Sequence, residues 1–321
     1  MIPARTDAVA ERLDRLATDS GQFAILALDH ARSFATTIRP NDPDSLSSDE
    51  IIATKDRLID GISREASAVL VDPAVAMRRS GLGDGRLIVG IEDGDYGAEA
   101  TAPRLLPGWS VEQAVDLGAQ AVKISFSFKP RGKTRSAERF VTETARRCEE
   151  AGIPLFCEPL ARLPTGADVR EGVHEGIRRF GALGAHVLKI QFPADTVRER
   201  SRTMWADAAA EASELSPIPW ALLSEGREFE DFRELLDIAC RAGASGFVAG
   251  RAIWGPARES EAATATARAR LMQLRSIAVA QGRPWRHHRS GRVEATDEGR
   301  ARSVIGRTAA SQGEVGGGEV L

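Results

Sequence analysis

The 321-residue sequence predicts an α/β fold, a closed (β/α)8 TIM barrel within a single domain. Two observations support this prediction. Eight short apolar runs alternate with amphipathic helical patterns, which is typical of a parallel sheet whose outer face is covered by helices. No Gly-x-Gly-x-x-Gly turn follows the first run, although a doubly wound sheet would usually have one there. Eight strand–helix units in roughly 260 residues fit a closed barrel.

The eight apolar runs are the expected strands. In chain order they are FAILALD from Phe23, AVLVDP from Ala68, LIVGIE from Leu87, AVKISF from Ala121, PLFCEPL from Pro154, HVLKIQF from His186, PWALLSEG from Pro219 and GFVAGR from Gly246. Four of them follow a helix-ending glycine, in the segments LGAQAVK, AGIPLF, LGAHVLK and AGASGFV. Glycine is favoured there because the residue after a helix often adopts a left-handed conformation. The repeat therefore predicts a helix before each of these strands.

The two ends of the chain lie outside this repeat. Residues 1–21 have the pattern of an amphipathic helix that ends at Gly21, without the apolar segment of an export signal. After Gly282 the apolar periodicity stops, and Gly, Ser, Arg and Glu predominate. We therefore predict a barrel domain over residues 1–282 and a flexible tail over residues 283–321 that is disordered or packs peripherally.

Composition and charge argue against several classes of protein. The 43 basic and 46 acidic residues give a net charge of −3, so the chain as a whole does not attract nucleic acid. No apolar run approaches the roughly 18 residues that a membrane-spanning helix needs. Cys148, Cys157 and Cys240 are far apart and form no C-x-x-C pair, which predicts reduced thiols rather than disulfides or a zinc site. We expect a cytoplasmic protein with no nucleic-acid or membrane partner.

Polar residues stand at the carboxyl end of every predicted strand. In chain order they are Asp29, Asp72, Glu92, Lys123, Glu158, Lys189, Ser224 and Arg251. The carboxyl ends of the strands form the active-site face of a (β/α)8 barrel. Any one of these residues alone would also fit a structural role, such as Asp72 capping a turn before Pro73.

Three of these residues come from neighbouring strands and are expected to converge. Two ammonium groups, those of Lys123 and Lys189, would repel each other in a barrel with little water, so the pKa of one should fall from about 10.4 toward neutrality. Such an amine is a nucleophile, and Glu158 beside it could transfer protons during Schiff-base chemistry. The alternative is a structural ion network that braces the barrel.

The last two strands predict a site for an anionic group. The loops after these strands often bind phosphate in this fold. LLSEG contains Ser224 and Gly226, and VAGRAIWG contains Gly250 and Arg251, which together offer a hydroxyl, backbone amides and a guanidinium. A salt bridge from Arg251 to a neighbouring helix is the alternative.

Seven segments between Phe23 and Gly255 resemble one family of class I aldolases, which includes tagatose-bisphosphate and sulfofructose-phosphate aldolases. The segments are LALDHARS, VLVDP, LGAQAVKISF, LFCEPL, VLKIQFP, PWALLSEG and GASGFVAGRAIWG. The resemblance implies retro-aldol cleavage of a phosphorylated ketose into dihydroxyacetone phosphate and an aldehyde, through an imine on Lys189. The family's strand-five glutamate falls on Glu158 and its strand-four lysine on Lys123. Its strand-seven serine and strand-eight arginine fall on Ser224 and Arg251.

The residues and the resemblance together predict one set of site residues. Lys189, Glu158 and Lys123 are expected to be catalytic. The expected substrate-binding residues are Asp29, Arg32, Ser224, Gly226, Gly250 and Arg251. We expect no metal and no cofactor, a phosphorylated sugar as the small-molecule partner, and a homo-oligomer.

The chain departs from the family pattern at two places. The first strand ends in DHARS, so His30 stands where a glutamine is expected and Arg32 is displaced. Glu225 stands where the family has a small or neutral residue, although a carboxylate near an anionic substrate is repulsive. Because side chains alternate along a strand, we expect Glu225 to point away from the substrate, toward the helices, and to pair with Arg227 or Arg251.

Three other functions stay open at this point. A metal-dependent aldolase of the same fold would need clustered histidines, which the sequence does not place together. A lyase acting on a deoxy or 2-keto-3-deoxy sugar phosphate would use the same imine. A non-catalytic sugar-phosphate sensor would use Arg251 and Ser224 but would have no use for Lys189.

Overall fold

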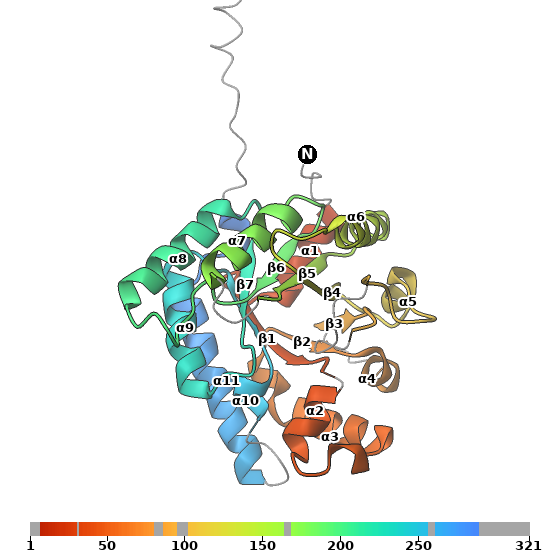
Figure 1. The fold of residues 1–321 in the computed structure, drawn as a ribbon. Coiled ribbons are helices and arrows are strands. Elements are labelled where there is room, and N and C mark those ends of the chain that lie inside the picture. Colours follow the sequence, from red (N-terminus) through yellow and green to blue (C-terminus); the bar gives the residue numbers. More distant parts are fainter. Residues whose placement is uncertain are drawn as a thin grey trace, which may run out of the picture. The chain divides into compact units, whose positions relative to one another are not determined.

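Parallel strands close into a barrel in the computed structural model, which describes residues 7–30, 32–79, 86–94, 102–163, 168–255 and 261–288 (Figure 1). Only the backbone is described for Arg32 and Glu261. The strands found in these residues are β1 (Phe23–Leu28), β2 (Ala68–Val71), β3 (Leu87–Gly90), β4 (Ala121–Phe128), β5 (Leu155–Ala161), β6 (Val187–Ile190), β7 (Trp220–Leu223) and β8 (Gly246–Ala249). Each strand pairs in parallel with its chain neighbours, and β8 pairs with β1. The predicted barrel is confirmed.

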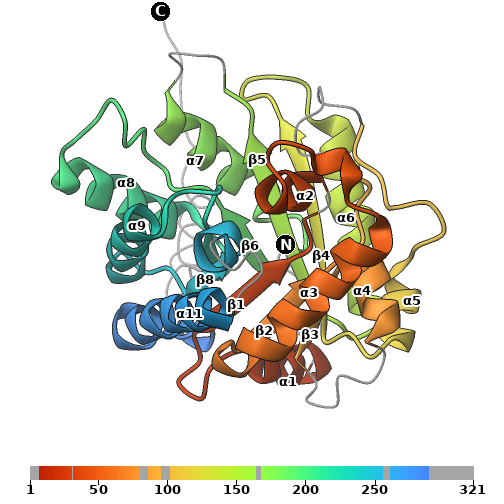
Figure 2. The same cartoon turned by 90° about the horizontal axis from the view of Figure 1, so that it is seen from below.

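Helices follow the strands and cover the outside of the barrel (Figure 2). They are α2 (Arg32–Ile38), α3 (Ser48–Ile62), α4 (Pro73–Arg78), α5 (Val111–Asp116), α6 (Arg135–Glu150), α7 (Val169–Phe180), α8 (Arg202–Leu215), α9 (Phe229–Arg241), α10 (Arg251–Trp254) and α11 (Glu261–Gln281). The expected first helix is α1 (Asp7–Leu16), whose Val9, Leu13 and Leu16 are buried. Left-handed glycines precede β4, β5, β6 and β8, among them Gly118 and Gly184, as the sequence pattern predicts.

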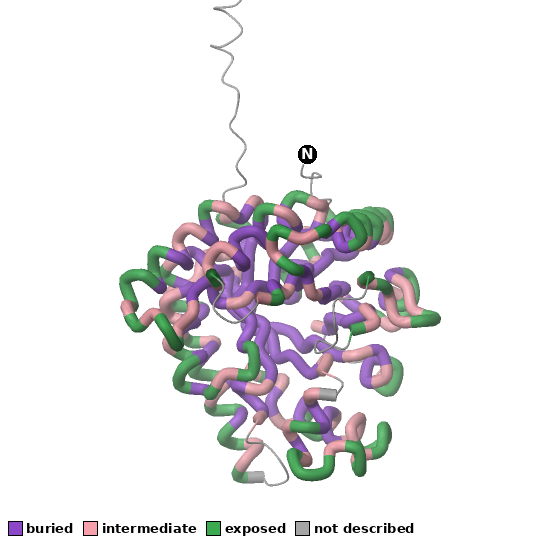
Figure 3. Tube along the Cα trace, in the orientation of Figure 1, coloured by how far each residue is buried: buried purple, intermediate pink, exposed green. Residues whose placement is uncertain are grey.

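Two apolar layers hold the barrel together, and the strands are its most buried part (Figure 3). The outer layer fills the space between the strands and the helices. The inner layer fills the barrel at the end where the strands begin. It consists of the inward-facing side chains, which occupy alternate positions along the strands, such as Phe23, Phe156 and Val187. The buried face of α1 and the Trp285 ring belong to this inner layer. The inner layer therefore leaves only the carboxyl ends of the strands for polar groups.

The segment after α11 packs on the barrel as far as His288. The Arg283 amide donates to the Ala244 carbonyl at 2.9 Å, and the Trp285 amide donates to the Gly21 carbonyl at 2.9 Å. A short 3-10 helix, η3 (Trp285–His287), buries the Trp285 ring. Residues 283–288 of the predicted tail thus pack against the barrel, with the Trp285 ring in its inner layer, and residues 289–321 lie outside the described residues. In the part of the chain that the structure describes, no helix is both long and apolar enough to cross a membrane.

The alternation of side chains along the strands positions the polar residues. Lys123, Glu158 and Lys189 each stand two residues beyond an inward-facing apolar residue of the inner layer. They therefore point into the barrel, directly above its apolar filling.

Candidate active site

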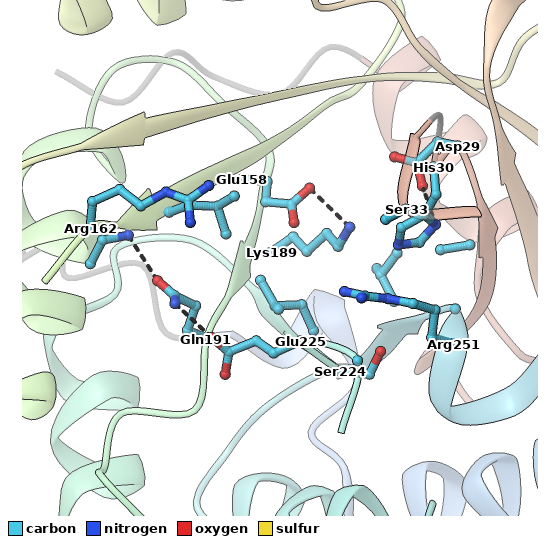
Figure 4. A pocket seen from close by; sticks show the side chains of 17 residues that line it. Asp29, His30, Ser33, Glu158, Arg162, Lys189, Gln191, Ser224, Glu225 and Arg251 are labelled. Carbon is cyan, nitrogen blue, oxygen red and sulfur yellow. Dashed lines mark hydrogen bonds and ion pairs between the residues drawn. The ribbon is translucent and has the colours of Figure 1, made fainter. Parts of the chain in front are cut away.

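A pocket of about 330 Å³ opens at the carboxyl ends of the strands (Figure 4). Six of the predicted site residues line it together with Lys189: Asp29, Glu158, Ser224, Gly226, Gly250 and Arg251. Lys123 is fully buried next to the pocket, against Glu158. Arg32 begins α2, and its side chain lies outside the described residues. The structure thus gathers the predicted residues whose side chains it describes around one cavity.

Lys189 projects into this pocket beside a carboxylate. Its Nζ donates a hydrogen bond of 2.9 Å to Glu158 Oε2, and each residue is only 5% exposed. A lysine so far removed from water is costly unless a partner compensates its charge. The pair places an amine and a proton acceptor in contact, facing the cavity.

Lys123 is held by three carboxylates. Its Nζ lies 2.7 Å from Asp29 Oδ2 and 3.2 Å from Glu158 Oε2, and it also donates to Glu92. The same Glu158 oxygen contacts both ammonium groups, so the carboxylate stands between the two lysines. The sequence analysis kept an ion network of the two lysines and Glu158 as the alternative to an activated amine, but it did not expect Asp29 and Glu92 to pair with Lys123.

Asp29 is ionised deep in this cluster. Burial alone would raise the pKa of Asp29, but the charges of Lys123 and Lys189 outweigh it and hold that pKa well below its usual range. The carboxylate lines the pocket and accepts from Lys123. It is therefore a fixed negative charge on the pocket wall.

His30 adds an imidazole to the same wall. Burial lowers its pKa to about 4, and the nearby charges of Lys189 and Arg251 act in the same direction against the opposing charge of Asp29. Its Nδ1 lies 3.6 Å from Asp29 Oδ1, and its ring packs edge-on against Trp254 with 5.8 Å between the centroids. The pocket therefore carries a neutral imidazole at neutral pH.

The low pKa of His30 predicts a pH effect on stability. The unfolded chain binds a proton on this residue below a pH of about 6.5, and the folded chain does not until about pH 4. The free energy of unfolding should therefore fall by roughly 1–3 kcal/mol as the pH drops from 6.5 to 4. Urea unfolding of the wild type and of His30→Gln over this pH range measures the fall in the free energy of unfolding. An equal pH dependence in the two proteins would contradict the assignment.

The adjoining wall, formed by the ends of β7 and β8, is built around Arg251. Its guanidinium lies over Gly226, where an added Cβ would be 2.6 Å from Arg251 Cζ. Gly226 has a φ of 74° and Glu225 a φ of 50°, and the Arg227 amide donates to the Ser224 carbonyl, which makes a tight turn of type I′. Burial lowers the pKa of Arg251, and the Glu225 charge opposes that shift. The turn thus holds a guanidinium at the pocket.

Gly250 allows the His30 ring and the Ala27 carbonyl group to lie close to its Cα atom. A Cβ there would lie 2.6 Å from His30 Cε1 and 2.7 Å from the Ala27 carbonyl oxygen. The residue caps α10, whose first residue is Arg251. Glycine at this position therefore lets the His30 ring and the Arg251 side chain share one end of the pocket.

Residues 23–255, which span β1 to the end of α10, match the family described as DeoC/LacD family aldolase. The chain belongs to this aldolase family. Curated relatives include a tagatose 1,6-diphosphate aldolase from Listeria monocytogenes, 28% identical over 276 residues that cover 75% of this chain and 80% of the relative. Tagatose 1,6-diphosphate aldolase 2 from Enterococcus faecalis is 25% identical over 273 residues, covering 75% and 82%. The resemblance inferred from the sequence is confirmed at the level of the family.

Solved aldolase structures share the fold of this family member. One is an archaeal fructose 1,6-bisphosphate aldolase with a TM-score of 0.62 and 21% identity, covering 84% of this chain and 98% of that one. Another archaeal fructose-1,6-bisphosphate aldolase, described with its catalytic Lys covalently bound to the carbinolamine intermediate of the substrate, has a TM-score of 0.60, 21% identity and the same coverage. These likenesses support the (β/α)8 fold.

Glu225 of this aldolase does not follow the strand alternation from which its direction was predicted. β7 ends at Leu223, so Glu225 lies in the turn beyond the strand and lines the rim of the pocket instead of facing the helices. Its carboxylate accepts a 2.6 Å hydrogen bond from Gln191 Nε2 and lies 3.5 Å from Arg227. The expected partner Arg227 is therefore present, and the carboxylate is turned toward Gln191 (Figure 4).

Sequence reasoning missed several residues of this site. Gln191 bridges two strand ends, because it also accepts from the Ala161 amide at 2.8 Å. Arg162 lines the pocket four residues after Glu158, and that even spacing was a usable signal. Lys55 of α3 is buried, donates to the His30 carbonyl at 2.7 Å and pairs with Asp72. The position of Lys55 in the sequence carries no signal of this long-range contact.

Proposed function

We propose that this aldolase cleaves a phosphorylated ketose into dihydroxyacetone phosphate and an aldehyde through a Schiff base on Lys189. The observation that carries the proposal is the contact of Lys189 Nζ with Glu158 at 2.9 Å inside the pocket. An amine next to a carboxylate in a site with little water is the pairing that imine chemistry needs. The tagatose-diphosphate aldolases among the relatives support a phosphorylated ketose as the substrate class.

The reaction begins with Lys189 and Glu158. Lys189 gives a proton to Glu158, the resulting amine attacks the C2 carbonyl, and Glu158 returns the proton that lets the hydroxyl leave as water. The C3–C4 bond of the resulting imine breaks when the C4 hydroxyl loses its proton, and the bonding electrons pass into the imine as an enamine. Asp29 and Glu158 both line the pocket, and either carboxylate can receive this proton. Protonation of C3 and attack of water then release dihydroxyacetone phosphate and regenerate the lysine.

Lys123 and the β7–β8 wall have different roles in this proposal. Lys123 keeps the carboxylates around it ionised and in place, since it contacts Asp29, Glu92 and Glu158. Arg251 and Ser224, with the amides of Gly226 and Gly250, hold the C1 phosphate. The bis-anionic character of such ketoses fits a pocket whose walls carry fixed cations.

Two other functions fit the residues less well. A sugar-phosphate sensor would use the β7–β8 wall but would gain nothing from a buried Lys189–Glu158 pair, which costs stability. A Schiff-base lyase for a deoxy or 2-keto-3-deoxy sugar phosphate would use the same lysine, and no contact in the pocket favours it. Metal independence, a cytoplasmic location and a homo-oligomeric state stay predictions.

A substrate panel tests the proposed reaction. Incubation with tagatose 1,6-bisphosphate, fructose 1,6-bisphosphate and sulfofructose phosphate should release dihydroxyacetone phosphate from at least one of them, measured with a coupled dehydrogenase. EDTA should leave the rate unchanged, because the imine takes the place of a metal as electron acceptor. Cleavage only of a deoxy or 2-keto-3-deoxy sugar phosphate would favour the alternative lyase, and a rate that EDTA abolishes would contradict the Schiff base.

A further inference from the structure

A serine hydroxyl is buried beside the Lys189–Glu158 pair without a hydrogen-bond partner. Ser125 of β4 is 4% exposed, and its Oγ has no partner among the residues that the structure describes. The great majority of buried polar groups in folded proteins are hydrogen-bonded, because an unpaired one costs stability. Exceptions are expected mainly at functional sites. The Ser125 hydroxyl is therefore a candidate for a role in the reaction.

Ser125 points into the barrel. Side chains alternate along β4, and the flanking residues Ile124 and Phe126 belong to the outer apolar layer. The Phe126 ring packs there against Phe180 of α7, with 4.8 Å between the ring centroids. Lys123, two residues before Ser125, lies in the cluster of carboxylates inside the barrel. The Ser125 side chain therefore shares the inward face of the strand with Lys123.

The strand register places Ser125 beside Glu158. In the pair formed by β4 and β5, Ser125 lies directly opposite Glu158. Across β5 and β6, Lys189 is the neighbour of Glu158, because the residues one position earlier on these strands are paired. Neighbouring strands are about 4.8 Å apart. A hydroxyl, a carboxylate and an amine therefore stand in one row across three strands, with the carboxylate of Glu158 in the middle.

The two lysines supply the donors that Glu158 has in the structure. Lys189 Nζ donates to Glu158 Oε2 at 2.9 Å, and Lys123 Nζ lies 3.2 Å from the same oxygen. An ammonium group has three N–H donors. Lys123 already contacts three carboxylates, those of Asp29, Glu92 and Glu158. Lys123 therefore cannot offer Glu158 a second donor without giving up another contact.

The proposed reaction weakens the contact between Lys189 and Glu158. Once Lys189 has formed an imine, its nitrogen is bonded to the substrate and keeps at most one proton. Glu158 is 5% exposed, so water has little access to replace the ammonium group. A buried carboxylate that loses a donor is destabilised. A hydroxyl beside Glu158 can replace the lost donor, because a serine O–H rotates to suit its partner.

We infer that Ser125 is a positioning residue of the reaction, whose hydroxyl forms a hydrogen bond with the Glu158 carboxyl group after Lys189 has become an imine. The inference rests on the proposed Schiff-base reaction and adds a residue to it. A hydroxyl donates to an ionised carboxylate and accepts from a protonated one, so it fits Glu158 in both protonation states. The hydroxyl thus holds the carboxyl group in place from cleavage of the C3–C4 bond to release of dihydroxyacetone phosphate.

The test compares turnover and stability in Ser125→Ala. We expect kcat to fall by about ten- to a hundredfold, the factor for one hydrogen bond to a charged group. Ser125 is not among the residues that line the pocket, so KM should change by less than about threefold. Borohydride should still trap the imine that dihydroxyacetone phosphate forms with Lys189, because the hydroxyl acts after this step. The midpoint of urea unfolding should stay the same or rise, since the variant removes an unpaired hydroxyl.

Ser245→Ala is the matched control. Ser245 stands directly before β8, at the amino end of the barrel, and its Oγ is also buried and unpaired within the described part of the chain. This variant should respond to urea in the same way and keep the wild-type kcat. Ser125→Cys is a second test, because a thiol fills the space of the hydroxyl but is a weak donor. Its kcat should fall nearly as far as that of Ser125→Ala.

The inference is wrong if Ser125→Ala or Ser125→Cys keeps the wild-type kcat. It is also wrong if Ser125→Ala unfolds at a lower urea concentration than the wild type, because the hydroxyl would then have a partner before any substrate binds. Failure of the proposed function would look different. The wild type would then form no imine that borohydride traps, and it would release no dihydroxyacetone phosphate from any ketose phosphate.

Discussion

Replacement of Lys189 by methionine is expected to abolish imine formation and to lower kcat by about a thousandfold or more. Methionine keeps the volume and the apolar stem but cannot attack a carbonyl, so the covalent route is lost entirely. The loss corresponds to about 4 kcal/mol or more of transition-state stabilisation. Because Glu158 then faces an apolar side chain and, among the described residues, keeps only Lys123 as a cation partner, the variant also tests whether the pocket tolerates the change.

Borohydride trapping measures the same step directly. Reduction in the presence of dihydroxyacetone phosphate should add a stable mass to one tryptic peptide, the one that contains Lys189. Circular dichroism of Lys189→Met should match that of the wild type, so that the loss is chemical. A mass on Lys123 instead, or a variant that retains activity, would show that the amine is assigned wrongly.

The fold could be predicted because its signals are local. Each strand is a short apolar run, and in β4, β5 and β6 a charged residue stands two positions after the inward-facing residue at the base of the strand. That spacing was enough to predict, without knowledge of the loops, that Lys123, Glu158 and Lys189 lie close together. Strand order in a barrel follows chain order, so neighbours in sequence were also neighbours in space.

The parts that could not be predicted lie beyond the strand ends. Side chains alternate between the two faces of a sheet only within a strand. The direction of the Glu225 side chain is therefore set by the turn after β7, in which two residues are left-handed. Lys55 reaches the site from α3, which no strand pattern addresses. The partners of Lys123 depended on where the chain turns after β1 and β3, because Asp29 and Glu92 follow those strands.

The three carboxylates around Lys123 make that residue the electrostatic centre of the site. Asp29, Glu92 and Glu158 are each no more than 7% exposed at the side chain, so water does little to screen them. Lys123 and Lys189 are the cations in contact with Glu158, and Lys123 is the one in contact with all three carboxylates. Removing Lys123 should therefore affect folding as well as catalysis.

Lys123→Met is expected to lower the free energy of unfolding by about 3–5 kcal/mol at neutral pH, the usual cost of breaking a buried ion pair from one side. The pH dependence should also change sign. In the wild type the pKa of Asp29 is held below its unfolded value. The contribution of the Asp29 carboxylate to stability is therefore present above about pH 4 and is lost as the pH falls. Without Lys123, burial should raise the pKa of Asp29, so this carboxyl group would bind a proton more readily in the folded state than in the unfolded one, and stability would be lost as the pH rises.

Urea unfolding at pH 5 and pH 8 distinguishes the two behaviours. The deficit of Lys123→Met relative to the wild type should be larger at pH 8 than at pH 5, because at pH 5 Asp29 of the variant is partly protonated. Lys133→Met, which removes an exposed lysine from the loop after β4, should show no deficit at either pH. A deficit that is equal at both pH values would mean that Lys123 stabilises the barrel by packing alone. In that case the ionised state of Asp29, on which the proposed proton transfers depend, would have to be maintained by the charge of Lys189.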